Sequence, residues 1–112
     1  MNILFVCNQN RDRSPTAEIL VNNEGKHKAK SAGLYCERDR VVSNDMIKWA
    51  DVVCVMEEHQ RDEINKRFPK QAFLKRILCL DVPNIYKFNQ SELVRLLKKK
   101  IKDVLSYSSS TK

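Results

Sequence analysis

The sequence lacks the features that mark several common classes of protein. No apolar run approaches the roughly 20 residues that a membrane-spanning helix requires. The opening segment, MNILFVC, has no basic region and no small-residue cleavage site, so we interpret it as a strand rather than a signal peptide. The four cysteines form no Cys-x-x-Cys pair and no Cys/His cluster with zinc spacing. We therefore expect a cytoplasmic protein with no membrane span and no metal site.

Glycine is scarce as well. The chain has 2 glycines, and neither lies in the polar stretch 7–14, CNQNRDRS, where a simple turn would use one. This stretch follows an apolar segment, contains two arginines and leads directly into a proline. Its composition therefore indicates a function beyond reversing the chain.

The bulk composition is that of one globular domain. The chain has 112 residues, of which 42% are hydrophobic and 31% are charged. We expect a single domain over residues 1–106 and a flexible C-terminal tail over residues 107–112. A count of 21 Lys and Arg against 14 Asp and Glu gives a net charge of +7, which favours anionic partners. The charge alone leaves open whether the anion is a phosphoester, a nucleic acid or an acidic protein surface.

Strand-like and helix-like segments alternate along the chain. Short apolar runs predict buried strands, and apolar residues at helical spacing predict helices. We expect strands at 2–6, 28–32, 51–56 and 77–80, and helices between residues 14 and 25, near residue 43, at 58–68 and at 89–105. The alternation predicts an α/β fold with a parallel sheet.

Residues that commonly end helices support these boundaries. Ser14 is expected as the N-cap of the first helix, with Pro15 at its first position and Gly25 as its C-cap. Asn89 and Glu92 have the spacing of a capping box at the start of the last helix. Pro69 is expected to end the helix at 58–68.

The stretch 7–14 has the chemistry of an anion site. It lies where a parallel α/β sheet binds ligands, beyond the carboxyl end of a strand and ahead of a helix N-terminus. Backbone N–H groups there can surround a tetrahedral oxyanion, and Arg13 can bind two of its oxygens. Positive groups also favour the thiolate form of a neighbouring cysteine, which makes Cys7 a candidate nucleophile. Ser14 can donate to that sulfur, and Asn10 stands where a left-handed backbone is expected.

The spacing of Cys7 and Arg13 is not specific by itself. A cysteine and an arginine six residues apart occur often by chance, and a buried cysteine at a strand end is commonly a small hydrophobic residue. The position after the first strand and before Ser-Pro favours the anion site.

The segment VCNQNRDRSPTAE closely resembles the phosphate-binding signature of the low-molecular-weight protein tyrosine phosphatases. That signature is Cys, five residues, Arg, Ser or Thr, then Pro-x-Ala-Glu. SAG at 31–33 resembles the end of the family's second strand, and DVVCVM at 51–56 resembles its third strand. The resemblance implies a three-layer α/β sandwich, with helices flanking a four-stranded parallel sheet. It implies a phosphomonoester hydrolase, a protein tyrosine phosphatase, that forms a phosphocysteine on Cys7 and requires no cofactor. The phosphoryl group would be bound by Asn8, Gln9, Asn10, Arg11, Asp12 and Arg13, and Ser14 would tune the thiolate.

The chain departs from the family pattern at three places. Gln9 and Asp12 replace a frequent glycine and a second cysteine, and residues 33–49 form a shorter segment than usual. The family's general acid is an aspartate on a late loop, where this chain has Asn84. Asp81 is the nearby carboxylate that could substitute for it, or it could simply cap a turn. Losing general acid catalysis typically costs on the order of 10²–10⁴ in rate.

Three hypotheses follow. The first is an active phosphatase whose substrates are phosphotyrosine proteins or small aryl phosphates. The second is a phosphate-binding or phosphotyrosine-binding module that has lost turnover, because Asn84 stands in place of the acid. The third, a phosphatase of RNA ends or nucleotides, depends on the net charge alone, and binding that is insensitive to salt would remove its support.

Overall fold

A four-stranded parallel sheet forms the centre of the molecule. The computed structural model describes residues 1–36 and 40–110. Its strands are β1 (Asn2–Cys7), β2 (Lys28–Gly33), β3 (Val52–Val55) and β4 (Arg76–Cys79). They are arranged in the order β2-β1-β3-β4, and every neighbouring pair is parallel. The predicted parallel sheet is therefore confirmed.

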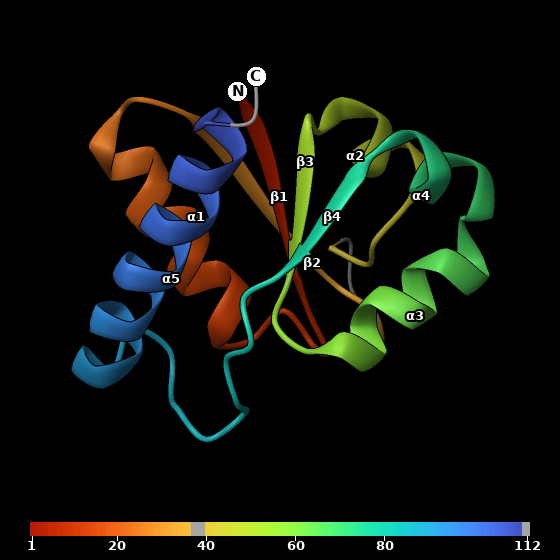
Figure 1. Ribbon diagram of the computed structural model, residues 1–112. Helices are drawn as coiled ribbons and strands as arrows, with labels where there is room; N and C mark the ends of the chain where they lie inside the picture. Colours follow the sequence, from red (N-terminus) through yellow and green to blue (C-terminus); the bar gives the residue numbers. More distant parts are fainter. Residues whose placement is uncertain (37–39, 111–112) are drawn as a thin grey trace.

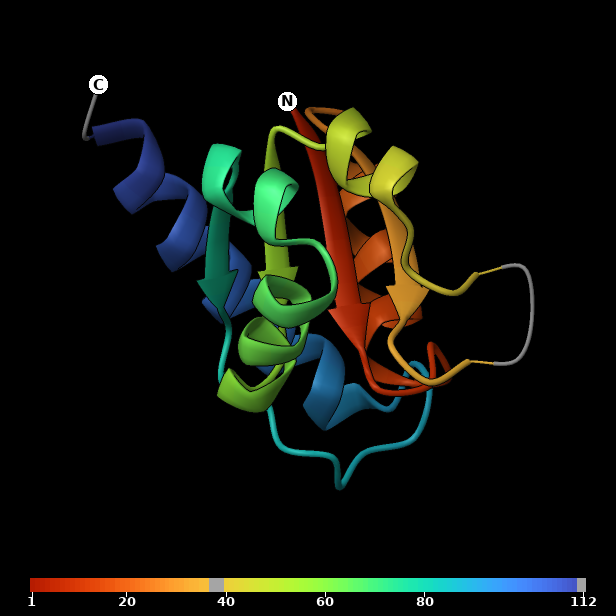
Figure 2. The same ribbon diagram turned by 90° about the vertical axis from the view of Figure 1, so that its right-hand side faces the viewer.

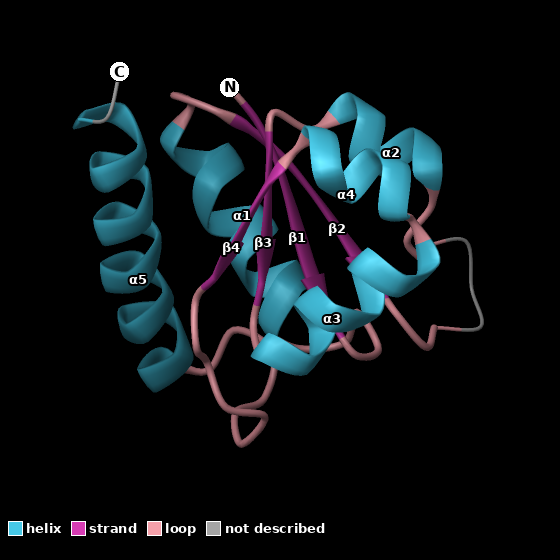
Figure 3. Ribbon diagram, turned by 45° about the vertical axis from the view of Figure 1, so that its right-hand side comes forward, coloured by secondary structure: helices cyan, strands magenta, loops and turns pink. Residues whose placement is uncertain are grey.

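Helices cover both faces of this sheet (Figures 1 and 3). One face carries α1 (Arg13–Glu24) and α5 (Ser91–Ser110). The other carries α2 (Asn44–Trp49), α3 (Glu58–Arg67) and α4 (Pro69–Leu74). The molecule is thus the three-layer α/β sandwich that the family resemblance implies.

The central strand β1 explains why its sequence is apolar without interruption. Ile3 and Phe5 pack in the core beneath α1 and α5, whereas Leu4 and Val6 pack in the core beneath α2, α3 and α4. Successive side chains of a strand point to opposite faces, and both faces of β1 are covered. All four side chains are fully buried.

The first helix begins two residues earlier than expected. The backbone oxygen of Asp12 accepts the first helical hydrogen bond, from the Thr16 N–H at 3.2 Å, so Asp12 and not Ser14 holds the N-cap position. Pro15 is accordingly the third residue of α1. The expected C-cap is confirmed, since Gly25 has a left-handed backbone with φ of 79°.

One further helix boundary differs from the prediction, and the structure contains one additional helix. Helix α5 begins at Ser91, and Asn89 has a left-handed φ of 58°, so Asn89 and Glu92 do not form the predicted capping box. Pro69 does follow the end of α3, but it also starts α4, because proline is well suited to a first helical position. We did not predict α4.

The C-terminal helix is long. It runs to Ser110 and so includes residues 107–110 of the segment for which we expect a tail, and residues 111–112 lie outside the described residues. No helix in the described part of the chain is both long enough and apolar enough to cross a membrane.

Because all strands run the same way, the segments that follow them gather at one end of the sheet (Figure 2). These are the loop 8–12 after β1, residues 56–57 after β3 and the loop 80–90 after β4. The candidate site lies at this end.

Candidate functional site

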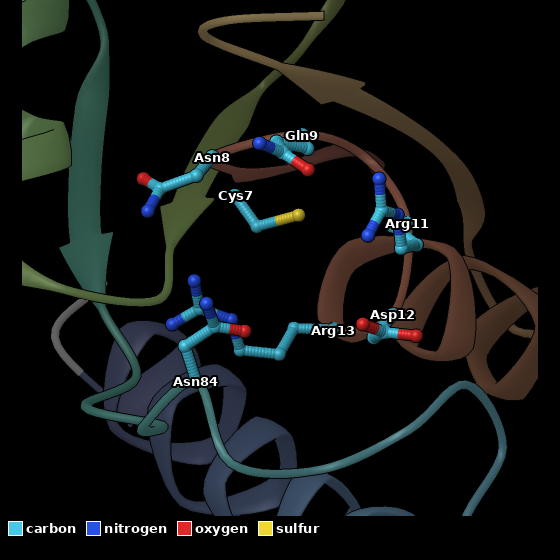
Figure 4. Close-up of a pocket in the computed structure, with 7 residues that line it drawn as sticks. All are labelled: Cys7, Asn8, Gln9, Arg11, Asp12, Arg13 and Asn84. Atoms are coloured by element: carbon cyan, nitrogen blue, oxygen red, sulfur yellow. The ribbon is translucent and has the colours of Figure 1, made fainter.

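A small pocket lies between the loop after β1 and the loop after β4. Its volume is about 70 Å³, which is several times what one water molecule needs and suits a small tetrahedral anion. Figure 4 shows the sulfur of Cys7 pointing into the space between the lining side chains. The pocket is lined by Cys7, Asn8, Gln9, Arg11, Asp12, Arg13 and Asn84. The structure thus brings together nearly all of the phosphate-binding residues that the sequence predicts.

Asn10 supports the pocket from outside. It has the left-handed backbone expected of it, with φ of 52°, and its Nδ2 donates to the hydroxyl oxygen of Ser14 at 3.0 Å. The Ser14 hydroxyl in turn lies 3.0 Å from the sulfur of Cys7. The other acceptor near this hydroxyl, the backbone oxygen of Ala32, is farther away at 3.5 Å, so the shorter contact favours donation to the sulfur. Ser14 therefore serves the cysteine rather than the helix end.

The loop is also held by the end of β2. Gly33 lies so close to it that a Cβ atom there would be 2.9 Å from the backbone nitrogen of Asn10 and 2.9 Å from the carbonyl carbon of Gln9. The backbone N–H of Tyr35 donates to the oxygen of Asn8 at 2.8 Å. Contacts with the neighbouring strand therefore fix the path of the loop.

Arg13 is held by two elements that lie far from it in the sequence. Its side chain is 2% exposed, and its Nη1 donates to Glu57 Oε2 at 2.6 Å and to the Val82 oxygen at 2.8 Å. The other guanidinium nitrogens, Nε and Nη2, make no hydrogen bond with the described residues. Arg13 is thus fixed from one side, and donors remain for an anion in the pocket.

Asn84, at the position of the family's acid, and Asp81, the carboxylate that could substitute for it, are placed differently. Asn84 lines the pocket, whereas Asp81 is exposed, has a left-handed φ of 56° and does not line it. Among the described residues that line the pocket, Asp12 carries the only carboxylate. Its Oδ1 accepts a hydrogen bond from the backbone N–H of Phe88, at 2.8 Å.

Three residues after β3 contact the site, and sequence reasoning missed them. Glu57 binds Arg13, and both His59 Nε2 and Gln60 Nε2 contact the side-chain oxygen of Asn8, at 3.1 and 2.9 Å. His59 is exposed and Gln60 is buried. The available signal was their position, since residues that directly follow a parallel strand lie at the same edge of the sheet as the loop after β1.

The thiols of Cys54 and Cys79 lie in environments that disfavour a reactive thiolate. Burial raises the pKa of Cys54 to about 12, and burial also raises the pKa of Cys79. Both residues lie in strands, and Cys54 is part of the core. Within residues 1–36 and 40–110, no group of His, Cys, Asp and Glu side chains could hold a metal ion.

Comparison with known proteins identifies the fold. No family model and no curated protein matches the sequence, but solved structures match over nearly the whole chain. The YwlE arginine phosphatase of Geobacillus stearothermophilus is 21% identical, with a TM-score of 0.71 over 97% of this chain and 96% of that one. The tyrosine phosphatase AmsI of Erwinia amylovora is 20% identical, with a TM-score of 0.75 over 95% of this chain and 91% of that one. A low-molecular-weight protein tyrosine phosphatase of Streptococcus pyogenes is 18% identical, with the same TM-score and coverage.

Proposed function

We propose that this chain, which has the fold of the low-molecular-weight protein tyrosine phosphatases, is a cytoplasmic, cysteine-dependent phosphomonoester hydrolase. Its substrates would be phosphotyrosine proteins or small aryl phosphates. The observation that carries the proposal is the Cys7 sulfur at the pocket, with the Ser14 hydroxyl 3.0 Å away and the buried Arg13 beside it.

Binding of the phosphoryl group follows from the charges of the pocket. The start of α1 offers unpaired backbone N–H groups and the positive end of the helix dipole. Arg13 has free donors on the pocket side, and Arg11 adds a second positive charge at the lining. These groups also suit the transition state, in which charge builds up on the phosphoryl oxygens.

The reaction would proceed in two steps. The Cys7 thiolate attacks phosphorus, so that an S–P bond forms while the P–O bond to the leaving group breaks. Water then attacks the phosphocysteine, the S–P bond breaks, and inorganic phosphate leaves as the thiolate returns. Ser14 stabilises the sulfur anion in both steps, and neither step requires a metal or an organic cofactor.

The charge of Arg11 favours phosphate esters over phosphoarginine. The guanidinium of a phosphoarginine side chain would leave the pocket as a cation, beside the positive charge of Arg11. A phenolic leaving group carries developing negative charge, which the same side chain attracts. We therefore favour tyrosine over arginine phosphatase activity, although proteins of both kinds share this fold.

The first test is phosphate release from an aryl phosphate and from a phosphotyrosine peptide, between about pH 5 and 8. Wild type and Cys7→Ser are compared. We expect turnover in the wild type and none in the variant, with phosphate binding retained in both. Turnover that survives in Cys7→Ser would refute the proposal.

A second candidate function is a phosphate reader that binds phosphotyrosine without hydrolysing it. The observation in its favour is that Asn84, which cannot donate a titratable proton, lines the pocket where an acid is expected. On this reading wild type binds a phosphotyrosine peptide with negligible turnover, and Asn84→Asp raises the rate. No gain in Asn84→Asp would count against it.

A further inference from the structure

The pocket contains a carboxylate that the family resemblance does not assign to catalysis. A phosphatase needs a proton donor for the leaving oxygen. Neither Asn84 nor Asp81, both in the loop 80–90, provides one in the pocket. Asn84 carries an amide, and the exposed Asp81 does not line the pocket. Asp12 does line it, at the end of the loop where α1 begins.

One carboxylate oxygen of Asp12 is held by a hydrogen bond, and the other is free to act on a substrate. Although Asp12 occupies the N-cap position of α1, its carboxylate makes no capping hydrogen bond to that helix. Instead Oδ1 accepts from the backbone N–H of Phe88, in the loop 80–90, at 2.8 Å. Its backbone oxygen accepts from the Thr16 side chain at 2.6 Å. Oδ2 has no hydrogen bond with the described residues, so it can carry and transfer a proton.

From this arrangement we propose that Asp12 is the general acid and base of the reaction, an inference that rests on the proposed phosphatase function. In the first step the P–O bond breaks, its electron pair goes to the leaving oxygen, and this oxygen takes the proton from Asp12 Oδ2. In the second step the Asp12 carboxylate takes a proton from water while the water oxygen attacks phosphorus. The S–P bond breaks, and Asp12 is protonated again for the next turnover.

The charges around Asp12 are compatible with this role. Cys7, Arg11 and Arg13 line the same pocket, and Lys87 precedes Phe88 in the late loop. Glu57, after β3, already pairs with Arg13 and so offsets one of these cations.

The test compares Asp12→Asn with Asp81→Asn on two substrates that differ in their leaving group. Asparagine has the size of aspartate and keeps the oxygen that accepts from Phe88, so the loop should hold its shape. Phenyl phosphate has a poor leaving group that needs a proton, whereas p-nitrophenyl phosphate has a good one. We expect Asp12→Asn to lower kcat/KM for phenyl phosphate by about 10²-fold or more, at the low end of what general acid catalysis supplies.

The results for the two variants distinguish a catalytic role of Asp12 from a structural one. In Asp12→Asn, kcat/KM should fall much less for p-nitrophenyl phosphate than for phenyl phosphate, because kcat/KM covers only the steps up to cleavage of the P–O bond. Equal losses of kcat/KM on both substrates would show a purely structural role and overturn the inference. It is also overturned if Asp81→Asn shows the leaving-group-dependent loss and Asp12→Asn does not. A wild type that is inactive on both substrates would instead refute the proposed function, and the inference with it.

Discussion

Gly33→Ala tests whether the end of β2 shapes the phosphate-binding loop. The added Cβ would lie 2.9 Å from backbone atoms of Gln9 and Asn10 and 3.1 Å from the Cβ of Cys36. Ordinary contacts of a Cβ begin at 3.4 Å, so the two backbone contacts are about 0.5 Å too short. Because backbone atoms cannot rotate away as a side chain can, the loop itself must move. Overpacking of this kind costs about 1–3 kcal/mol of stability.

The chain's other glycine provides the matched control. A Cβ at Gly25 meets no atom within 4 Å, but the φ of 79° is strained for alanine, at a cost of about 1–2 kcal/mol. Gly25→Ala and Gly33→Ala should therefore lose similar stability in urea unfolding. Only Gly33→Ala should bind inorganic phosphate more weakly, by about tenfold or more, since small displacements in a binding site have large effects.

Titration calorimetry with phosphate measures this difference without requiring turnover. If Gly33→Ala binds phosphate as well as wild type while losing stability, the loop does not depend on its contact with β2. If both variants lose phosphate binding equally, the loss reflects stability, and the reasoning from the local contact is wrong.

Three further predictions follow from individual side chains. Burial raises the pKa of Cys54 to about 12, so iodoacetamide at about pH 8 should leave this thiol unlabelled in the folded protein and label it in urea, as peptide mass spectrometry can show. Burial and the positive N-terminus lower the pKa of His27, so the unfolded chain binds the proton more readily. Stability should therefore fall as the pH drops below about 6.5, and His27→Gln should flatten this fall in urea titrations at several pH values. Glu57→Gln removes the charged partner of the buried Arg13 and should cost about 1–2 kcal/mol in urea unfolding, whereas the exposed neighbour Glu58→Gln should cost almost nothing.

The fold was predictable because its signals are local and redundant. The uninterrupted apolar runs of β1 and β3 indicate strands that are covered on both faces, and each is followed by a helix. The loop after β1 was predictable for a similar reason. Cys7, Arg13 and Ser14 lie within eight residues, and the start of the following helix determines which way they point.

The contacts that complete the site were not predictable, because they join residues far apart in sequence. Glu57 meets Arg13 across 44 positions, and Asp12 meets Phe88 across 76. No residue close to Asp12 in sequence indicates that its side chain contacts the loop 80–90 rather than capping α1. The sequence predicts Asp81 as the substitute acid because it is close to Asn84, but Asp81 does not line the pocket.

The scarcity of glycine in the loop now has a physical explanation. A tight anion-binding loop needs a left-handed residue and close backbone packing, and glycine usually supplies both within the loop. Here Asn10 takes the left-handed position, and its side chain also orients Ser14 toward the sulfur, which a glycine could not do. The close packing comes from Gly33 at the end of the neighbouring strand. The loop's shape is therefore set jointly by its own asparagine and by β2, so substitutions in β2 are expected to act on anion binding although they lie outside the pocket.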